Sequence, residues 1–215
     1  GLGINSEDRD YTAYDLLAGD ATLYEAIKET RWEGLLIIPA TTDLSSADIE
    51  LVANEKRSFL LHDALRQSAI DAFALDYILI DCPPSLNILT VNAMVAAHSV
   101  LIPLQSEFYA LEGLSQLMLT VREVRQSANP KLRIEGVVLT MYDRRNNLSQ
   151  QVEADARDNL GDLVLQIVIP RNVRLSEAPS FAMPILEYDP LSKGAEAYRE
   201  LAKELVQRER VAANG

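Results

Sequence analysis

The feature that most constrains the fold of this chain is a set of short runs that are apolar at consecutive positions. Strands that are buried on both faces have this pattern, because helices cover both sides of the parallel sheets that contain them. Four runs have this form and a fifth includes a polar residue; they lie at 35–39, 77–81, 99–103, 136–140 and 165–170. The runs therefore predict strands of a buried, mostly parallel sheet.

Segments with helical spacing separate these runs. Apolar residues recur at steps of three and four in 57–73, 110–126 and 193–210, which predicts a helix with one apolar face in each segment. Alternation of strands and helices at these lengths is typical of βαβ crossovers. We therefore predict an α/β fold with a doubly wound, mostly parallel sheet and helices on both faces, forming one domain over residues 1–215.

Composition excludes several other classes of protein. A single cysteine, Cys82, rules out a disulfide framework, and two histidines are too few for a structural zinc site. No apolar run approaches the ~20 residues that a membrane-spanning helix needs, so we expect a cytoplasmic protein. The net charge of −12 argues against a chain that coats nucleic acid with its whole surface, but it leaves room for a local basic patch.

Ligands of such sheets bind beyond the carboxyl ends of the strands, so the residues that follow each run are the candidates for chemistry. Asp81 is the most informative of them, because a carboxylate that ends an apolar strand is costly to bury without a partner. A magnesium ion, bound directly or through a water, is one such partner. The backbone of the following turn, capped by the carboxylate, is the other, and the spacing alone leaves both open.

The segment YILIDCPPSL at 77–86 resembles the Walker B segment of the ParA/Soj family of chromosome- and plasmid-partitioning ATPases. Further blocks resemble that family in its order: PLQSEFYALEGL at 103–114, LTMYDRRNNL at 139–148, IPRNVRLSEAPS at 169–180 and PILEYDP at 184–190. The likeness extends over essentially the whole chain, from GLGI at 1–4 onward. Chance does not readily place so many blocks in the correct order.

The resemblance implies a P-loop NTPase of the deviant Walker A class that binds ATP and Mg²⁺ and hydrolyses ATP. It implies that Asp81 reaches the magnesium ion through a coordinated water and acts as an electrostatic contributor to catalysis. It also implies contacts to the base and ribose from residues that end two late strands: Thr140, Met141, Pro170, Arg171 and Asn172. Cys82 has no partner at the spacing of a thiol nucleophile, so we interpret it as inert.

Four arginines form the clearest basic concentration in this acidic chain: Arg144, Arg145, Arg171 and Arg174. By resemblance, Arg145 and Arg174, with Arg144 beside them, bind DNA without sequence specificity in an ATP-bound homodimer. The alternative is that these arginines form ion pairs with Asp143, Glu153 and Glu177. The resemblance also implies that Glu107, Tyr109 and Glu112 approach the partner subunit, and that a ParB-like centromere-binding protein stimulates hydrolysis.

The predicted function is thus that of a cytoplasmic, nucleoid-associated ATPase of DNA segregation. One alternative is a non-catalytic remnant that binds DNA or a partner. Another is a membrane-associated positioning ATPase of the septum-site MinD type. The nearly balanced charge of 193–210 argues against the membrane-associated ATPase, because a helix that binds anionic lipid has an excess of Lys and Arg.

The sequence contains no G-x-x-x-x-G-K-[ST] motif, the P-loop whose backbone N–H groups hold phosphates. Members of the family carry their P-loop before a block like that at 1–4. We therefore expect this chain to lack the N-terminal part of the family domain, including the first two strands. Strands next to missing ones would keep unpaired backbone groups, so we expect the chain alone to be poorly stable and inactive.

A nucleotide titration tests this expectation. Residues 1–215 should bind a fluorescent ATP analogue weakly or not at all in the presence of Mg²⁺, because the phosphate-binding turn is not in the sequence. Tight, magnesium-dependent binding in a fluorescence titration would refute the expectation.

Overall fold

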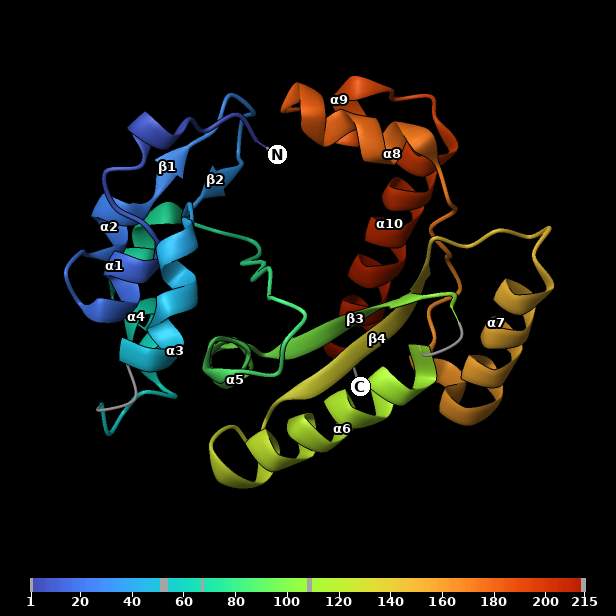
Figure 1. Cartoon of the computed structure of the whole chain (residues 1–215), viewed down its shortest axis with the longest axis horizontal. Helices are drawn as coiled ribbons and strands as arrows, with labels where there is room; N and C mark the ends of the chain where they lie inside the picture. Colours follow the sequence, from blue (N-terminus) through green and yellow to red (C-terminus); the bar gives the residue numbers. More distant parts are fainter. Residues whose placement is uncertain (1, 51–53, 67, 108–109, 214–215) are drawn as a thin grey trace. The chain divides into compact units, whose positions relative to one another are not determined.

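The computed structural model describes residues 2–50, 54–66, 68–107 and 110–213 (Figure 1). Its elements in chain order are η1 (Ser6–Asp8), α1 (Ala13–Ala18), α2 (Leu23–Ala26), β1 (Lys28–Glu29), β2 (Leu36–Ile37), η2 (Thr42–Ser46), α3 (Ala47–Glu50), α4 (Leu60–Leu65), η4 (Ser68–Phe73), α5 (Ile88–Ala96), β3 (Ser99–Gln105), α6 (Ala110–Ser127), β4 (Arg133–Thr140), α7 (Asn147–Leu160), η5 (Gly161–Leu163), α8 (Val173–Glu177), η6 (Ala178–Phe181), α9 (Ile185–Tyr188) and α10 (Lys193–Ala213). The helices expected in 110–126 and 193–210 are thereby confirmed.

The chain forms two compact units. The sheet unit comprises Gly1–Leu2, Ser99–Leu119 and Arg133–Gly215, and the helical unit comprises Gly3–His98 and Thr120–Leu132. Helix α6 begins in the first and ends in the second. The expectation of a single domain over residues 1–215 stays a prediction.

The sheet unit is built on a parallel pair of strands, β3 and β4. Ile102 pairs with Val137 and Leu104 with Leu139, so the two strands end together at Gln105 and Thr140. The segment 164–170 extends along the other edge of β4, with parallel bridges from Val137 to Val164 and from Tyr142 to Pro170. The predictions of parallel strands at 99–103 and 136–140 are confirmed.

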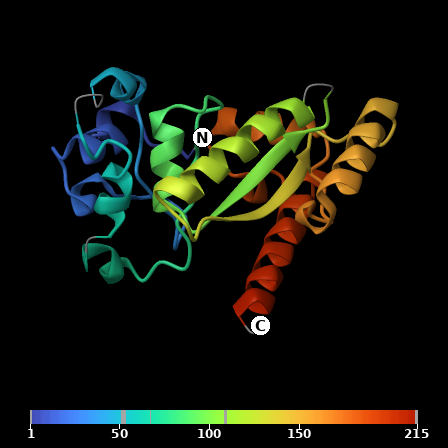
Figure 2. The ribbon, with the colours of Figure 1, turned by 90° about the horizontal axis from the view of Figure 1, so that it is seen from below.

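Helices cover both faces of this parallel pair, as Figures 1 and 2 show for α6 and α10. On one face, side chains of β3 and β4 pack with Leu114 of α6 and Ala156 of α7. On the other, Val138 packs with Leu201 of α10, and Ala197 and Leu205 of that helix border the same cluster. The unit therefore has the α/β class that the sequence predicts, with buried β4 residues facing a helix on either side.

The fifth predicted strand forms only in part. The backbone N–H groups of Leu165 and Ile169 donate to the carbonyls of Val137 and Leu139, at 2.9 and 2.8 Å. Between them, the N–H groups of Gln166 and Ile167 donate to the carboxylate of Glu204 on α10, at 2.9 and 3.0 Å. A side chain thus satisfies the backbone groups on the outer edge of this segment, as a neighbouring strand would otherwise do.

The helical unit is held by capped helices and one buried amide. Thr12 and Asp15 form a capping box at the start of α1, and Thr22 and Glu25 form another at α2. Asn92 of α5 is 1% exposed; its side chain accepts from the N–H of Leu61 and donates to the carbonyl of Arg57. The amide therefore ties α5 to the chain around α4.

The run at 77–81 departs from prediction. It was expected to be a buried strand, but it belongs to neither sheet, and Leu79 is 90% exposed. Among the described residues of the helical unit, the strands are β1 and β2, which pair with each other. Apolar composition makes a segment suitable for a buried strand, but a strand also needs a neighbour for its backbone hydrogen bonds.

Two further expectations are corrected. The run at 35–39 contributes only Leu36–Ile37, in an antiparallel pair with Lys28–Glu29 rather than in a parallel sheet. The segment 57–73 is not one helix, because α4 ends at Leu65 and the 3-10 helix η4 begins at Ser68. Residue 67, between them, lies outside the described residues.

Substitution of Gly136 tests the packing of the sheet unit. A Cβ atom at this buried strand position would lie 2.7 Å from Cδ2 of Leu165, which is itself fully buried. Gly136→Ala should therefore lower the free energy of unfolding by about 1–3 kcal/mol, measured by urea unfolding. The matched control is Gly113→Ala on the exposed face of α6, where a Cβ would meet nothing within 4 Å and should stabilise the helix by up to ~1 kcal/mol. An equal response of the two variants would contradict this account of the packing.

Candidate nucleotide and phosphate-binding site

The site is built where β4 and the segment 164–170 end side by side. Tyr142 joins them through its main chain: its N–H donates to the carbonyl of Ile169 at 3.1 Å, and its carbonyl accepts from the N–H of Arg171 at 3.0 Å. The structure thereby brings together the two predicted groups of nucleotide-contacting residues, Thr140–Met141 and 170–172. Met141 has a φ of 53°, in the left-handed region, where the chain turns out of the strand.

The Asn172 side chain already has a structural role in this arrangement. Its Oδ1 accepts the backbone N–H of Arg174 at 2.8 Å and so caps the start of α8. The amide nitrogen of this side chain has no hydrogen-bond role in the cap. Near the same strand end, the carbonyl of Thr140 accepts the N–H of Ser106 at 3.1 Å.

The arginines follow these strand ends, and three of the four have acidic partners. Arg145 forms a bidentate pair with Asp143, with Nε–Oδ1 and Nη2–Oδ2 distances of 3.1 and 3.0 Å. Arg174 lies 2.9 Å from Glu177 and 3.3 Å from Asp189, and Arg171 lies 3.8 Å from Glu107. The side chains of Arg145 and Arg174 are still 90% and 54% exposed. The ion pairs that were one of the two interpretations of these arginines are thus present. Because the side chains of Arg145 and Arg174 are also exposed, a phosphate could still reach them.

Asp143 is the electrostatic centre of this group. Hydrogen bonds from the Arg145 side chain and backbone, aided by the charges of Arg145 and Arg171, hold the pKa of Asp143 at about 2. Both arginines thus favour the ionised form of this one carboxylate. Because the pKa is lowered, the stabilising contribution of Asp143 is present above its unfolded pKa and is lost as the pH falls toward 2.

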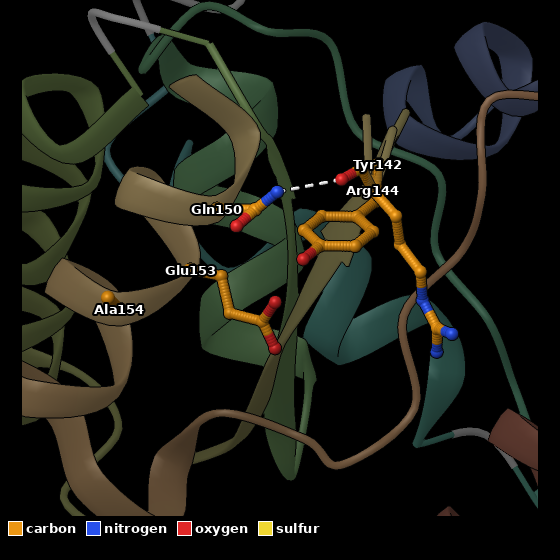
Figure 3. Close-up of a pocket in the computed structure, with 5 residues that line it drawn as sticks. All are labelled: Tyr142, Arg144, Gln150, Glu153 and Ala154. Carbon is orange, nitrogen blue, oxygen red and sulfur yellow. Dashed lines mark hydrogen bonds between the residues drawn. The ribbon is translucent and has the colours of Figure 1, made fainter. Parts of the chain in front are cut away.

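A shallow, open hollow of about 510 Å³ lies beside this group, lined by Tyr142, Arg144, Gln150, Glu153 and Ala154 (Figure 3). The Gln150 side chain donates to the carbonyl of Arg144 at 2.7 Å. Tyr142 is 8% exposed, and its hydroxyl donates to Glu153, which raises the pKa of Tyr142. Burial opposes ionisation of Glu153, but hydrogen bonds from Tyr142 and Arg157 outweigh it and lower the pKa of Glu153. The hollow is thus lined by the ionised carboxylate of Glu153 and by the exposed side chain of Arg144.

The sequence predicted no role for Tyr142 or Gln150 in this site, and it predicted Glu153 only as an ion-pair partner of an arginine. The sequence feature that could have indicated Tyr142 is its position directly after a strand, next to Thr140 and Met141. Glu153 also precedes Arg157 by four residues, a spacing that places the two side chains together on a helix, and they pair at 3.0 Å.

Asp81 and Cys82 lie in the helical unit, in the extended segment that precedes α5. Asp81 is exposed. Cys82 is exposed too, yet protein atoms near its thiol and the charge of Asp81 raise the pKa of Cys82, which disfavours a reactive thiolate. Within the part of the chain that is described, no three His, Cys, Asp or Glu side chains gather as a metal site. Of the residues expected near a partner subunit, Tyr109 lies outside the described residues, and Glu112 lies in the first turn of α6.

These features define an α/β protein with a parallel sheet, and comparison with known proteins identifies its family, one of the P-loop NTPase class. Residues 1–134 match the family described as AAA domain. The chain is 55% identical over 210 residues to the chromosome partitioning protein ParA of Caulobacter vibrioides, covering 98% of this chain and 78% of the relative. It is 52% identical over 215 residues to the sporulation initiation inhibitor protein Soj of Bacillus subtilis, covering 100% and 81%.

A solved structure supports the same class. Cobyrinic acid a,c-diamide synthase from Mycobacterium smegmatis, with bound ADP and magnesium, is 35% identical and superposes with a TM-score of 0.79 over 97% of this chain and 76% of its own. The chain belongs to the ParA/Soj family of chromosome-partitioning ATPases.

The Asp143–Arg145 pair can be tested directly. Arg145→Ala should raise the pKa of Asp143 from about 2 toward the ordinary value of ~3.9, because the guanidinium that stabilises the carboxylate is removed. Carboxyl-carbon NMR titration of labelled aspartate measures the shift. Arg144→Ala is the control, since Arg144 does not bond to Asp143; a similar rise in this variant would contradict the assigned cause.

Proposed function

We propose that this protein is a ParA-type ATPase of DNA segregation, in which ATP drives formation of a homodimer that binds DNA without sequence specificity. The observation that carries the proposal is identity of about half the residues to ParA and Soj proteins over nearly the whole chain. The arginines beside the strand ends add a chemical reason, because exposed guanidinium groups match phosphate geometry.

ATP and Mg²⁺ are the proposed ligands. Thr140, Met141 and the segment 170–172 would contact the base and ribose, chiefly through backbone groups. Magnesium in such sites takes one or two protein ligands and completes its coordination with phosphate oxygens and waters, so one exposed carboxylate, that of Asp81, fits this donor set. The ion would neutralise charge on the transferred phosphoryl group.

A ParB-like partner that stimulates hydrolysis is part of the same proposal, as is location at the nucleoid in the cytoplasm. Binding of ATP can act as a switch only if it favours the dimer over the monomer. Release from DNA after hydrolysis would then follow from loss of that preference.

The contacts of α10 favour this function over membrane positioning. Leu201 packs inside the sheet unit, Glu204 accepts two backbone N–H groups, and Arg208 donates to the carbonyl of Asp162 at 2.9 Å. A helix that inserts its apolar face into lipid would have to give up this packing. In the described part of the chain, no helix is both long and apolar enough to cross a membrane.

The experiment compares DNA binding with ATP and with ADP in the full-length protein. Binding should be stronger with ATP, and the double variant Arg145→Ala, Arg174→Ala should bind at least tenfold more weakly at ~100 mM salt, because two phosphate contacts are lost. Asp81→Ala should abolish the difference between ATP and ADP while leaving the arginines in place.

Two outcomes would overturn the proposal. Undiminished DNA binding by the double arginine variant would exclude this surface. DNA binding that does not respond to nucleotide in the unchanged protein would favour a non-catalytic DNA-binding module.

A further inference from the structure

Two of the three arginines that are proposed to bind DNA, Arg145 and Arg174, are already bound to carboxylates of their own chain. Arg145 places one edge of its guanidinium, formed by Nε and Nη2, on Asp143, whose Oδ1 also accepts the backbone N–H of Arg145 at 3.0 Å. This is the same planar, two-pronged geometry in which an arginine binds a phosphate. Asp143 therefore occupies one of the two guanidinium edges through which Arg145 could form a two-pronged contact with a DNA phosphate.

Arg174 repeats the arrangement with different partners. Glu177 lies 2.9 Å from its Nη1 atom and Asp189 lies 3.3 Å from its Nε atom. The hydroxyl of Tyr188 donates to Glu177 at 3.1 Å and helps to fix the carboxylate in place. Two acids thus share this one guanidinium.

Arg144 differs from both. Within the described residues it forms no ion pair closer than 4.0 Å, although it is near enough to Glu153 to help lower the pKa of that carboxylate. Its guanidinium can meet a phosphate without first leaving a carboxylate. Of the three arginines that are proposed to bind DNA, which form the arginine surface, Arg145 and Arg174 have carboxylate partners, and Arg144 has none within the described residues.

We propose that Asp143, and likewise Glu177 with Asp189, are competitive ligands of the DNA-binding arginines, so that these carboxylates set the affinity for the phosphate backbone. The inference rests on the proposed function, since it needs DNA as the ligand. A phosphate that binds the Nε–Nη2 edge of Arg145 exchanges one anionic partner for another, and it leaves the displaced carboxylate close to a second anion. The gain in free energy from each such contact is accordingly smaller than that from an unpaired arginine.

Neutralising the competing carboxylate tests the inference. Asp143→Asn keeps an oxygen that can accept the backbone N–H of Arg145, so the turn is preserved while the charge is removed. In the full-length protein with ATP, this variant should bind DNA about three- to fivefold more tightly at ~100 mM salt. The slope of log K against log[salt] should become steeper by about 1, because one more phosphate is neutralised.

The matched control is Asp158→Asn on α7. Asp158 is exposed, and it is in none of the ion pairs found in the described part of the chain, so the substitution gives the same change in net charge without releasing an arginine. The gain from Asp143→Asn should exceed that from Asp158→Asn, and it should disappear in the Arg145→Ala background. Glu177→Gln should show the same dependence on Arg174.

The outcomes separate this inference from the proposed function. If Arg145→Ala weakens DNA binding but Asp143→Asn gains no more than Asp158→Asn, the carboxylate is not a competitor and the inference fails while the proposed function stands. If Arg145→Ala leaves DNA binding unchanged, the arginine surface itself is not the DNA site. A gain from Asp143→Asn that persists without Arg145 would also overturn the inference, because the effect would then be one of general charge.

Discussion

The parallel pairing of β3 with β4, continued by the segment 164–170, is the constraint on which the sheet unit and its site depend. Parallel strands end at the same edge, so these pairings set Thr140 beside Gln105 and Tyr142 beside Pro170. The main chain of Tyr142 then fixes both strand ends to each other through two hydrogen bonds. The arginines follow these strand ends within a few residues, so the same geometry determines where they lie.

The sequence predicted strands correctly where their neighbours could also be identified. The runs at 99–103 and 136–140 flank one amphipathic helix, α6, and such a crossover makes the strands partners. The run at 77–81 has the same apolar pattern and yet forms no strand, because the pattern reports only that a segment can be buried and says nothing about a hydrogen-bonding neighbour. The hairpin pairing at 28–29 and 36–37 depends on a turn that apolar periodicity does not detect.

The location of the candidate site was predictable, but its side-chain partners were not. Strand ends are visible in the sequence, so the approach of Met141 to Asn172 follows from fold class alone. Whether an asparagine oxygen caps a helix or faces a ligand depends on a turn of the backbone, and Asn172 caps α8. Both interpretations of Arg145 were possible from its neighbours, and only coordinates show the two-pronged contact with Asp143.

These contacts also bear on how an acidic chain can bind a polyanion. A net charge of −12 opposes approach to DNA, but salt screens charges beyond about 8–10 Å, so contacts at the surface depend mainly on the nearest groups. At Arg145 and Arg174 the nearest groups are carboxylates about 3 Å away, which partly cancel the arginine charge where it would act. DNA binding would then require several arginines to contact the same phosphate backbone at once. Arg145 and Arg174 would each give up a carboxylate partner for a phosphate, with little net gain in free energy. In the proposed dimer, two sets of such contacts would meet one DNA segment, whereas a monomer would offer one set, and this difference gives a physical reason for the proposed dependence of DNA affinity on dimer formation.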